Sequence, residues 1–279
     1  MNYNSEIEKI HLALLIIMKE IDRICKKNNI CYSLTGGSMI GAVRHGGFIP
    51  WDDDMDIAML RSEYDRFLTC CKNDLDERFE LQTPESDLDY PYNFAKIIAK
   101  GTKIVQYGYE DVSWNKGLYI DIFPLDNVPK SVFKKKIHKV RNYYYIKMIE
   151  RKTSSYIVDK HNIVKVIGFR ILDILTKFTT LSSLKKSLVK NCIKYNNMDS
   201  ECVCNLGGMY GYDRETTKKE YFLHTKRVPF ETEEFDIIKD YDKYLSRVYG
   251  DYMQIPPVGK RHVHNFVELD FGDLFLEEK

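Results

Sequence analysis

The chain has 279 residues and a formal net charge of +1, and 44% of its residues are hydrophobic, 30% charged and 13% aromatic. This composition provides enough apolar side chains for a folded core and excludes a disordered or fibrous chain. The sequence contains neither a run of about 18 apolar residues that would span a membrane nor a signal peptide, so we expect a cytoplasmic protein.

The first half of the chain predicts alternating helices and short strands. Apolar residues recur at three- and four-residue spacing over residues 4–28, which predicts a helix. The elements expected next are a strand over 30–34, a Gly-Gly-Ser turn, a short helix over 38–44, a strand over 55–60 and a helix over 62–75. Further strands are expected over 79–82, twice within 92–105, and over 117–124, where Pro124 closes the last one.

From residue 131 the pattern becomes long, helical and basic. Two helices are expected within 131–191, followed by a Gly-rich loop over 205–211, a strand over 226–230 and a helix over 236–249. We therefore expect a catalytic core over 1–129, a basic helical subdomain over 130–200, and a part over 201–279 that completes the catalytic domain.

Charge is distributed unevenly between these parts. Residues 130–194 contain 17 Lys and Arg against 3 Asp and Glu, a net charge of +14, and the remainder carries −13. An anionic partner is expected for the basic middle, either an anionic membrane surface or an acidic glycan. The alternative is that these charges only solvate an ordinary helical subdomain.

The seven cysteines show no paired spacing. Cys202 and Cys204 lack a second Cys or His pair nearby, so we expect no zinc site. Reduced thiols agree with a cytosolic compartment.

The densest cluster of functional side chains lies in the segment TGGSMIGAVRHGGFIPWDDDMDI, residues 35–57. Asp54 and Asp56 are two residues apart, so in an extended chain they project from the same strand face. Carboxylate oxygens on one face suit Mg²⁺ or Mn²⁺, whose coordination substrate phosphates complete. Backbone N–H groups of Gly36 and Gly37 and the hydroxyl of Ser38 suit a phosphate.

The acidic segment has two other interpretations. Asp52, Asp54, Asp56 and Glu63 imitate the spacing of an EF-hand calcium loop, but that loop requires Gly at its sixth position, where this chain has Ile57. A solvated acidic turn is the other alternative. The phosphate-and-metal interpretation predicts phosphoryl or nucleotidyl transfer.

Asp121 lies between Ile120 and Ile122 in an apolar strand, where a lone carboxylate is costly unless it is paired or liganded. It is either a third metal ligand or general base beside Asp54 and Asp56, or a structural residue bonded to the backbone. Asp126 is a weaker candidate in the loop beyond.

Several basic side chains are candidates for substrate binding. Lys96, among apolar residues, either extends its ammonium to solvent or meets the donor diphosphate. Arg44 and His45 precede Gly46 and Gly47, where the backbone can approach a phosphate closely. His262 and His264 share one face of an extended chain and serve either substrate binding or only the surface.

Three blocks of the sequence resemble one protein family. LTGGSMIGAVRHGGFIPWDDDMDIAM, GLYIDIFPLDNVP and YLSRVYGDYMQIPPVGKRHVHNF are similar to blocks of the LicD family of phosphotransferases. That family includes bacterial phosphorylcholine transferases and is related to the fukutin-related ribitol-phosphate transferases. The resemblance covers nearly the whole chain except the basic middle. The zinc-binding Cys cluster of the eukaryotic relatives has no counterpart here.

The resemblance implies an α+β fold of the nucleotidyltransferase type, a small mixed sheet flanked by helices. It implies that Gly37 and Ser38 form the phosphate turn, that Asp54 and Asp56 form the metal pair, and that Asp121 is the third carboxylate. The gap from Ser38 to Asp54 is longer than in the wider nucleotidyltransferase pattern, so the match is closest to LicD itself.

The implied activity is Mg²⁺-dependent transfer of a phospho-alcohol, with phosphocholine from CDP-choline preferred, to a sugar of a teichoic acid, capsule or lipopolysaccharide precursor. CDP-glycerol and CDP-ribitol are also compatible donors. Trp51, Trp114 or Tyr119 could enclose a trimethylammonium group. The partners expected are the CDP-alcohol, the glycan acceptor and the inner face of an anionic membrane, with no nucleic acid.

Two rival functions remain. A true nucleotidyltransferase would keep the nucleotide monophosphate on its product and release pyrophosphate. A non-catalytic glycan- or lipid-binding protein would use the basic middle, although pure binding gains nothing from three clustered acids.

Overall fold

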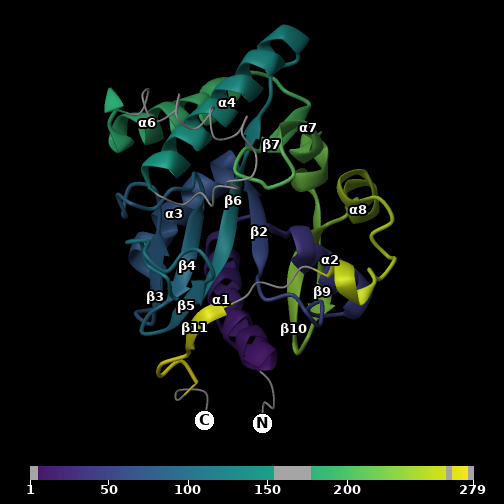
Figure 1. Ribbon diagram of the computed structural model, residues 1–279. Coiled ribbons are helices and arrows are strands. Elements are labelled where there is room, and N and C mark those ends of the chain that lie inside the picture. Colours follow the sequence, from purple (N-terminus) through teal and green to yellow (C-terminus); the bar gives the residue numbers. More distant parts are fainter. Residues whose placement is uncertain (1–5, 154–176, 262–265, 276–279) are drawn as a thin grey trace.

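The computed structural model describes residues 6–153, 177–261 and 266–275 (Figure 1). The helices are α1 Glu6–Asn28, α2 Gly36–His45, α3 Arg61–Asp74, α4 Val132–Lys152, α6 Leu181–Cys192, α7 Tyr212–Glu215 and α8 Tyr241–Tyr249, with 3₁₀ turns at Ile193–Tyr195, Lys219–Leu223 and Val258–Lys260. The strands are β1 Ser33–Leu34, β2 Asp56–Leu60, β3 Phe79–Gln82, β4 Ala95–Ala99, β5 Lys103–Gln106, β6 Tyr119–Asn127, β7 Cys202–Asn205, β8 Thr216–Lys218, β9 Thr225–Phe230, β10 Glu233–Ile238 and β11 Phe266–Asp270.

A mixed sheet organises the fold. Its strand order is β1-β2-β6-β4-β3, and β7 pairs with the carboxyl-terminal residues of β6 and with β8. β2 and β6 are parallel, whereas β1, β4 and β7 pair antiparallel with their neighbours. This central position of β6 brings segments that are far apart in the sequence to one place.

Helices α1 and α3 pack against each other and against the sheet. α1 contacts β4 and β6, and α3 contacts β2 and β6. α1 buries an apolar stripe that includes Ile10, Leu14, Ile17 and Ile21. Acidic residues in its first turn and basic residues in its last turn favour the helix dipole. The predicted helix over 4–28 is confirmed for its described part.

A second core lies at the end of the molecule opposite both termini (Figure 1). There α4 and α6 pack on each other, and Met148, Ile149 and Leu188 meet Val128 and Cys204 from the β6 and β7 region.

Two further ribbons complete the fold. β9 pairs with β10, and β11 returns from the C-terminal part to pair with β5.

The structure corrects several predicted boundaries. The Gly-Gly-Ser segment is the first turn of α2 rather than a separate turn, and Gly36, where α2 begins, has a positive φ of 60° that favours glycine. β1 covers only residues 33–34 of the predicted strand over 30–34. β6 runs through Pro124 to Asn127, so this proline does not close the strand as predicted. Residues 236–238 belong to β10, so the predicted helix over 236–249 begins at Tyr241. The three-part division of the chain stays a prediction.

Candidate active site

A row of charged side chains crosses the middle of the sheet. In the parallel pairing of β2 with β6, Asp56 lies beside Asp121. In the antiparallel pairing of β6 with β4, Asp121 lies beside Lys96. Side chains at paired positions emerge on the same face of a sheet, so the three strands present Asp56, Asp121 and Lys96 side by side.

Lys96 is only 6% exposed, and its ammonium does not reach solvent. The Nζ atom lies 2.8 Å from Oδ1 of Asp121 and 3.1 Å from the centre of the Tyr119 ring. Burial lowers the pKa of Lys96, and the Asp121 carboxylate opposes that shift. Burial likewise raises the pKa of Asp121, against the effect of Lys96. The solvent-reaching alternative for Lys96 is therefore wrong.

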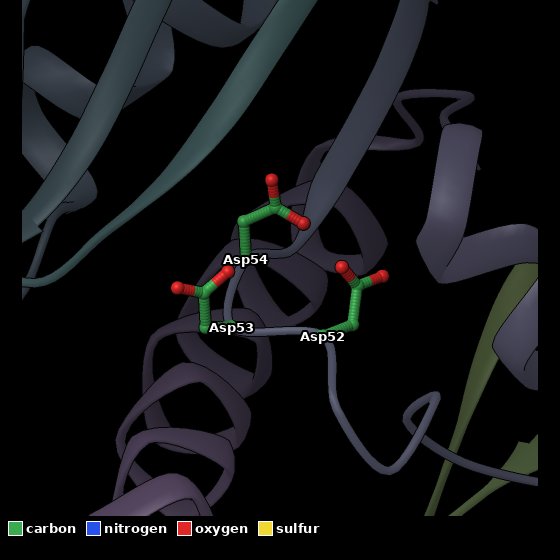
Figure 2. Close-up of side chains that lie close together, drawn as sticks. All are labelled: Asp52, Asp53 and Asp54. Carbon is green, nitrogen blue, oxygen red and sulfur yellow. The ribbon is translucent and has the colours of Figure 1, made fainter. Parts of the chain in front are cut away.

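The loop before β2 adds three more carboxylates (Figure 2). Asp52, Asp53 and Asp54 each place a ligand oxygen within 4.8 Å of the other two. Because β2 begins at Asp56, Asp54 lies in this loop and not on the strand itself, which corrects the predicted same-strand pair. The pKa of Asp56 is raised well above its ordinary value. Burial is the largest cause, and the negative charges of Asp54 and Asp121 raise the pKa further. Crowding of this kind is relieved by a bound cation.

The amino end of α2 fixes this acidic region. Ser38 Oγ accepts a hydrogen bond of 2.8 Å from the N–H of Asp56, and the N–H of Thr35 donates to the Asp56 carbonyl at 3.0 Å. A Cβ at Gly36 would lie 3.2 Å from Asp56 Oδ2, and one at Gly37 would lie 2.3 Å from Asp52 Oδ2. The two glycines therefore let the carboxylates approach the positive end of the helix. Their predicted contact with phosphate stays a prediction.

Arg44 is directed to the C-terminal part of the chain. Its Nη1 donates to the carbonyl of Tyr252 at 2.6 Å, and its Nε donates to Nε2 of His45 at 2.9 Å. His45 meets the Trp51 ring edge-on, with centroids 6.3 Å apart. Arg44 thus anchors a loop near the acidic segment, and its contact with phosphate remains untested. His262 and His264 lie outside the described residues.

Two residues near this site were not singled out from the sequence. His11 on α1 donates from Nε2 to the carbonyl of Asp52 at 2.6 Å and stacks on Phe48, so it holds the acidic loop. Glu215 is 8% exposed, and burial raises its pKa to about 7. Its Oε1 accepts a hydrogen bond from the N–H of Tyr210 at 3.2 Å. No local sequence pattern predicts the contact of His11 with a loop 41 positions away. Glu215 lies shortly after the Gly-rich loop over 205–211, and this position in the sequence could have marked it as a candidate.

Comparison with known proteins identifies the family of this chain. The family model described as LicD/FKTN/FKRP, nucleotidyltransferase domain, matches residues 29–157. A lipopolysaccharide cholinephosphotransferase LicD of Haemophilus influenzae is 33% identical over 92% of this chain and 95% of its own length. The chain belongs to the LicD family. An uncharacterised protein of Rickettsia typhi is 45% identical over a shorter stretch, 20% of this chain and 18% of that protein.

The LicD assignment confirms the resemblance and the nucleotidyltransferase-like α+β fold. The matched domain contains β2, β4 and β6, and so the row formed by Asp56, Asp121 and Lys96. The basic helix α4 also falls within the matched range, so the family resemblance extends further into the basic middle than the sequence blocks indicated.

Proposed function

We propose that this protein transfers phosphocholine from CDP-choline to a sugar hydroxyl of a cell-surface glycan precursor. Membership of the LicD family makes it a phosphotransferase, and the relative from Haemophilus influenzae is named for transfer of cholinephosphate in lipopolysaccharide. The observation that carries the proposal is the row of Asp56, Asp121 and Lys96 beside the Asp52–Asp54 loop. Lipopolysaccharide, teichoic acid and capsule precursors are all acceptors of the required chemistry.

The residues present fit a Mg²⁺ or Mn²⁺ ion. Asp54, Asp56 and Asp121 offer hard oxygen ligands, and burial, together with the charges of Asp54 and Asp121, raises the pKa of Asp56, an effect that a bound cation would oppose. When bound, the ion would neutralise charge on the donor diphosphate.

The protein's own groups account for the remaining requirements of the transfer. The acceptor oxygen attacks the phosphorus of the phosphocholine group, the bond from that phosphorus to the CMP oxygen breaks, and CMP leaves with the electron pair. Asp121 either completes the metal site or takes the proton of the acceptor hydroxyl. Lys96, fixed beside Asp121, supplies positive charge to the phosphate oxygens.

Asp56→Asn and Asp54→Asn test this function, because each removes one charge and keeps the shape of the side chain. Both variants should fold and lose phosphocholine transfer, and excess EDTA should abolish transfer by the wild type. The assay follows CDP-choline consumption and CMP release, with CTP and phosphocholine offered in parallel. Full activity in either variant contradicts the assigned site, and pyrophosphate release from CTP identifies the rival nucleotidyltransferase.

We also propose that the protein contacts the inner face of an anionic membrane through α4. No helix among the described residues is long and apolar enough to cross a bilayer. On α4, however, Phe133 is 72% exposed and Val140 65% exposed, next to the exposed Lys134 and Lys136. Apolar and basic side chains together on one exposed helix are typical of binding in the membrane interface.

A further inference from the structure

A small cavity lies beside the Lys96–Asp121 pair. It has a volume of about 50 Å³, and Tyr92, Tyr109, Trp114 and Tyr119 line it together with Lys96. We call these four aromatic residues the aromatic pocket. The volume is far below the roughly 300–1,000 Å³ that holds a whole drug-sized ligand, so the cavity suits a headgroup rather than a nucleoside.

The rings of the aromatic pocket are arranged around a cation already. The Lys96 ammonium lies 3.1 Å from the Tyr119 centroid and 5.7 Å from that of Tyr92. Trp114 meets Tyr92 and Tyr109 at steep angles, with centroids 6.4 Å and 6.1 Å away. The face of such a ring carries the negative part of its quadrupole and attracts positive charge, so a cation in the cavity would bind against a ring face and not against an edge.

The lining also discriminates between kinds of cation. Among the described residues that line the cavity, none is Asp or Glu; the amide side chains there are Gln106 and Asn115, and the Oδ1 of Asn115 already accepts a hydrogen bond from the N–H of Gly117. A primary ammonium needs hydrogen-bond acceptors to replace its water, whereas a trimethylammonium donates no hydrogen bond and gains from apolar ring faces. Lys116 also borders the cavity, but its Nζ donates to the carbonyls of Glu110 and Val112 and is engaged there.

The position of the cavity matches the proposed reaction. A donor phosphate held by Lys96, and by a cation on the carboxylates of the row, would direct its alcohol substituent to the adjoining space. Trp51, by contrast, packs beneath the Arg261 guanidinium, 4.0 Å from its ring centre, and belongs to another part of the surface.

We propose that the aromatic pocket binds the trimethylammonium group of phosphocholine and so selects choline over ethanolamine as the transferred alcohol. This inference rests on the proposed function for the position of the phosphate. The binding preference itself, however, can be measured without turnover.

The test is calorimetric titration of the full-length protein with phosphocholine, phosphoethanolamine and CMP, in the presence of Mg²⁺. The wild type should bind phosphocholine at least about 10-fold more tightly than phosphoethanolamine, as expected for a desolvated cation–π site. Trp114→Leu and Tyr109→Leu should abolish this preference, and Trp114→Tyr should restore most of it. Tyr107→Leu, an exposed tyrosine of the same loop, is the matched control and should bind like the wild type.

The outcomes separate this inference from the proposed function. Equal binding of the two phospho-alcohols by the wild type, or an unchanged preference in both Leu variants, overturns the pocket assignment. Trp114-dependent binding of CMP without phosphocholine binding also overturns it and makes the cavity a base site. A Trp114-dependent choline preference in a protein that never consumes CDP-choline supports the pocket and rejects the transferase function.

Discussion

Asp121 and Asp126 lie on the same strand, β6, and meet different partners. Asp126 is fully buried and accepts hydrogen bonds from Nε and Nη2 of Arg61, both at 2.8 Å, and from Nδ2 of Asn196 at 2.7 Å. Asp121 faces the site and pairs with Lys96. The weaker sequence candidate thus belongs to a buried ion pair, and the stronger one lies in the charged row.

This difference predicts that the same substitution impairs the reaction itself only at Asp121. Asp121→Asn should lose stability because it leaves the buried Lys96 without its counter-charge, and it should also lower the transfer rate per folded molecule by roughly 10²–10⁴-fold, the range expected for a lost general base. Asp126→Asn should cost about 3–5 kcal/mol of unfolding free energy, because it leaves Arg61 buried without its counter-charge, and should retain activity per folded molecule. Denaturant titration and specific activity, measured on one preparation of each variant, decide the matter. Activity of Asp121→Asn at the wild-type level contradicts the assignment.

Glu215 makes the stability of the fold depend on pH. Burial raises its pKa from 4.5 to about 7, so between these values the folded chain holds a proton that the unfolded chain has lost. The free energy of unfolding therefore falls as pH rises through this window. Glu215→Gln removes the contribution and should make the protein more stable than wild type near pH 8 by up to about 3 kcal/mol, with little difference near pH 4.5. Denaturant titrations at the two pH values measure this, with exposed Glu77→Gln as control.

At the scale of elements, α2 carries two glycines whose replacement should separate function from stability. A Cβ at Gly37 would meet only the mobile end of Asp52, whereas one at Gly41 would lie 2.4 Å from the backbone carbonyl of Gly47. Gly37→Ala should therefore keep the melting temperature and displace the Asp52 carboxylate, raising the Mg²⁺ concentration needed for half-maximal activity. Gly41→Ala should lose about 1–3 kcal/mol of stability through overpacking. Thermal melting and Mg²⁺ titration of both variants test this, and an unchanged Mg²⁺ requirement in Gly37→Ala contradicts it.

The elements show how far local pattern determines the fold. The predicted helices and strands of residues 6–127 are present, because their apolar periodicity agrees with the faces they bury. Residues 236–238 further along the chain were predicted as helix and are strand. Ile237 and Ile238 continue the helical spacing of α8, but Phe235 and Ile237 alternate as in a strand, and pairing with β9 decides in favour of the strand.

The site could be predicted only in part for a similar reason. The acidic segment and Asp121 are visible in the sequence as carboxylates in unusual places. The pairing of Asp121 with Lys96, and the role of His11, depend on strand register and helix packing across distant segments. Such contacts are set by the assembled sheet and not by neighbours along the chain.

At the scale of the whole molecule, the basic helix and the acidic site lie at opposite ends of the same strand. Asp121 stands near the start of β6, and α4 follows its other end. Six residues of strand separate Asp121 from Asn127, which corresponds to roughly 20 Å. An acceptor glycan carried on a membrane lipid would have to extend over at least this distance to reach the site from a bilayer at α4.

The first part of α4 has an inverted arrangement of side chains. It buries His138 and Asn142, and the two ring nitrogens of His138 are 2.8 Å from the Tyr212 hydroxyl and the Asn191 carbonyl. It exposes Phe133 and Val140 instead. Residues seven apart lie on one helix face, so these two apolar side chains form part of a single exposed stripe. Lys139 is engaged by Asp213, whereas Lys134, Lys136 and Arg141 are the other exposed cations of this part of α4, and Lys134 and Lys136 lie next to Phe133 in the sequence.

Co-sedimentation with vesicles tests whether this stripe binds a membrane. The wild type should bind vesicles of mixed anionic and neutral lipid at low salt and release them as salt screens the attraction. Lys134→Glu with Lys136→Glu should weaken binding by at least about 30-fold, since each lysine contributes about 1 kcal/mol near the surface. Phe133→Ser with Val140→Ser should weaken vesicle binding at every salt concentration, because these variants lose apolar burial and not charge.

The control is Lys9→Glu with Lys72→Glu, which makes the same change of charge at exposed positions of α1 and α3 and should bind like the wild type. An equal loss of binding in that control pair would show that the net charge of the protein, and not the position of the lysines, determines binding. Equal binding of the wild type to neutral vesicles would show that the lysines do not contribute to binding.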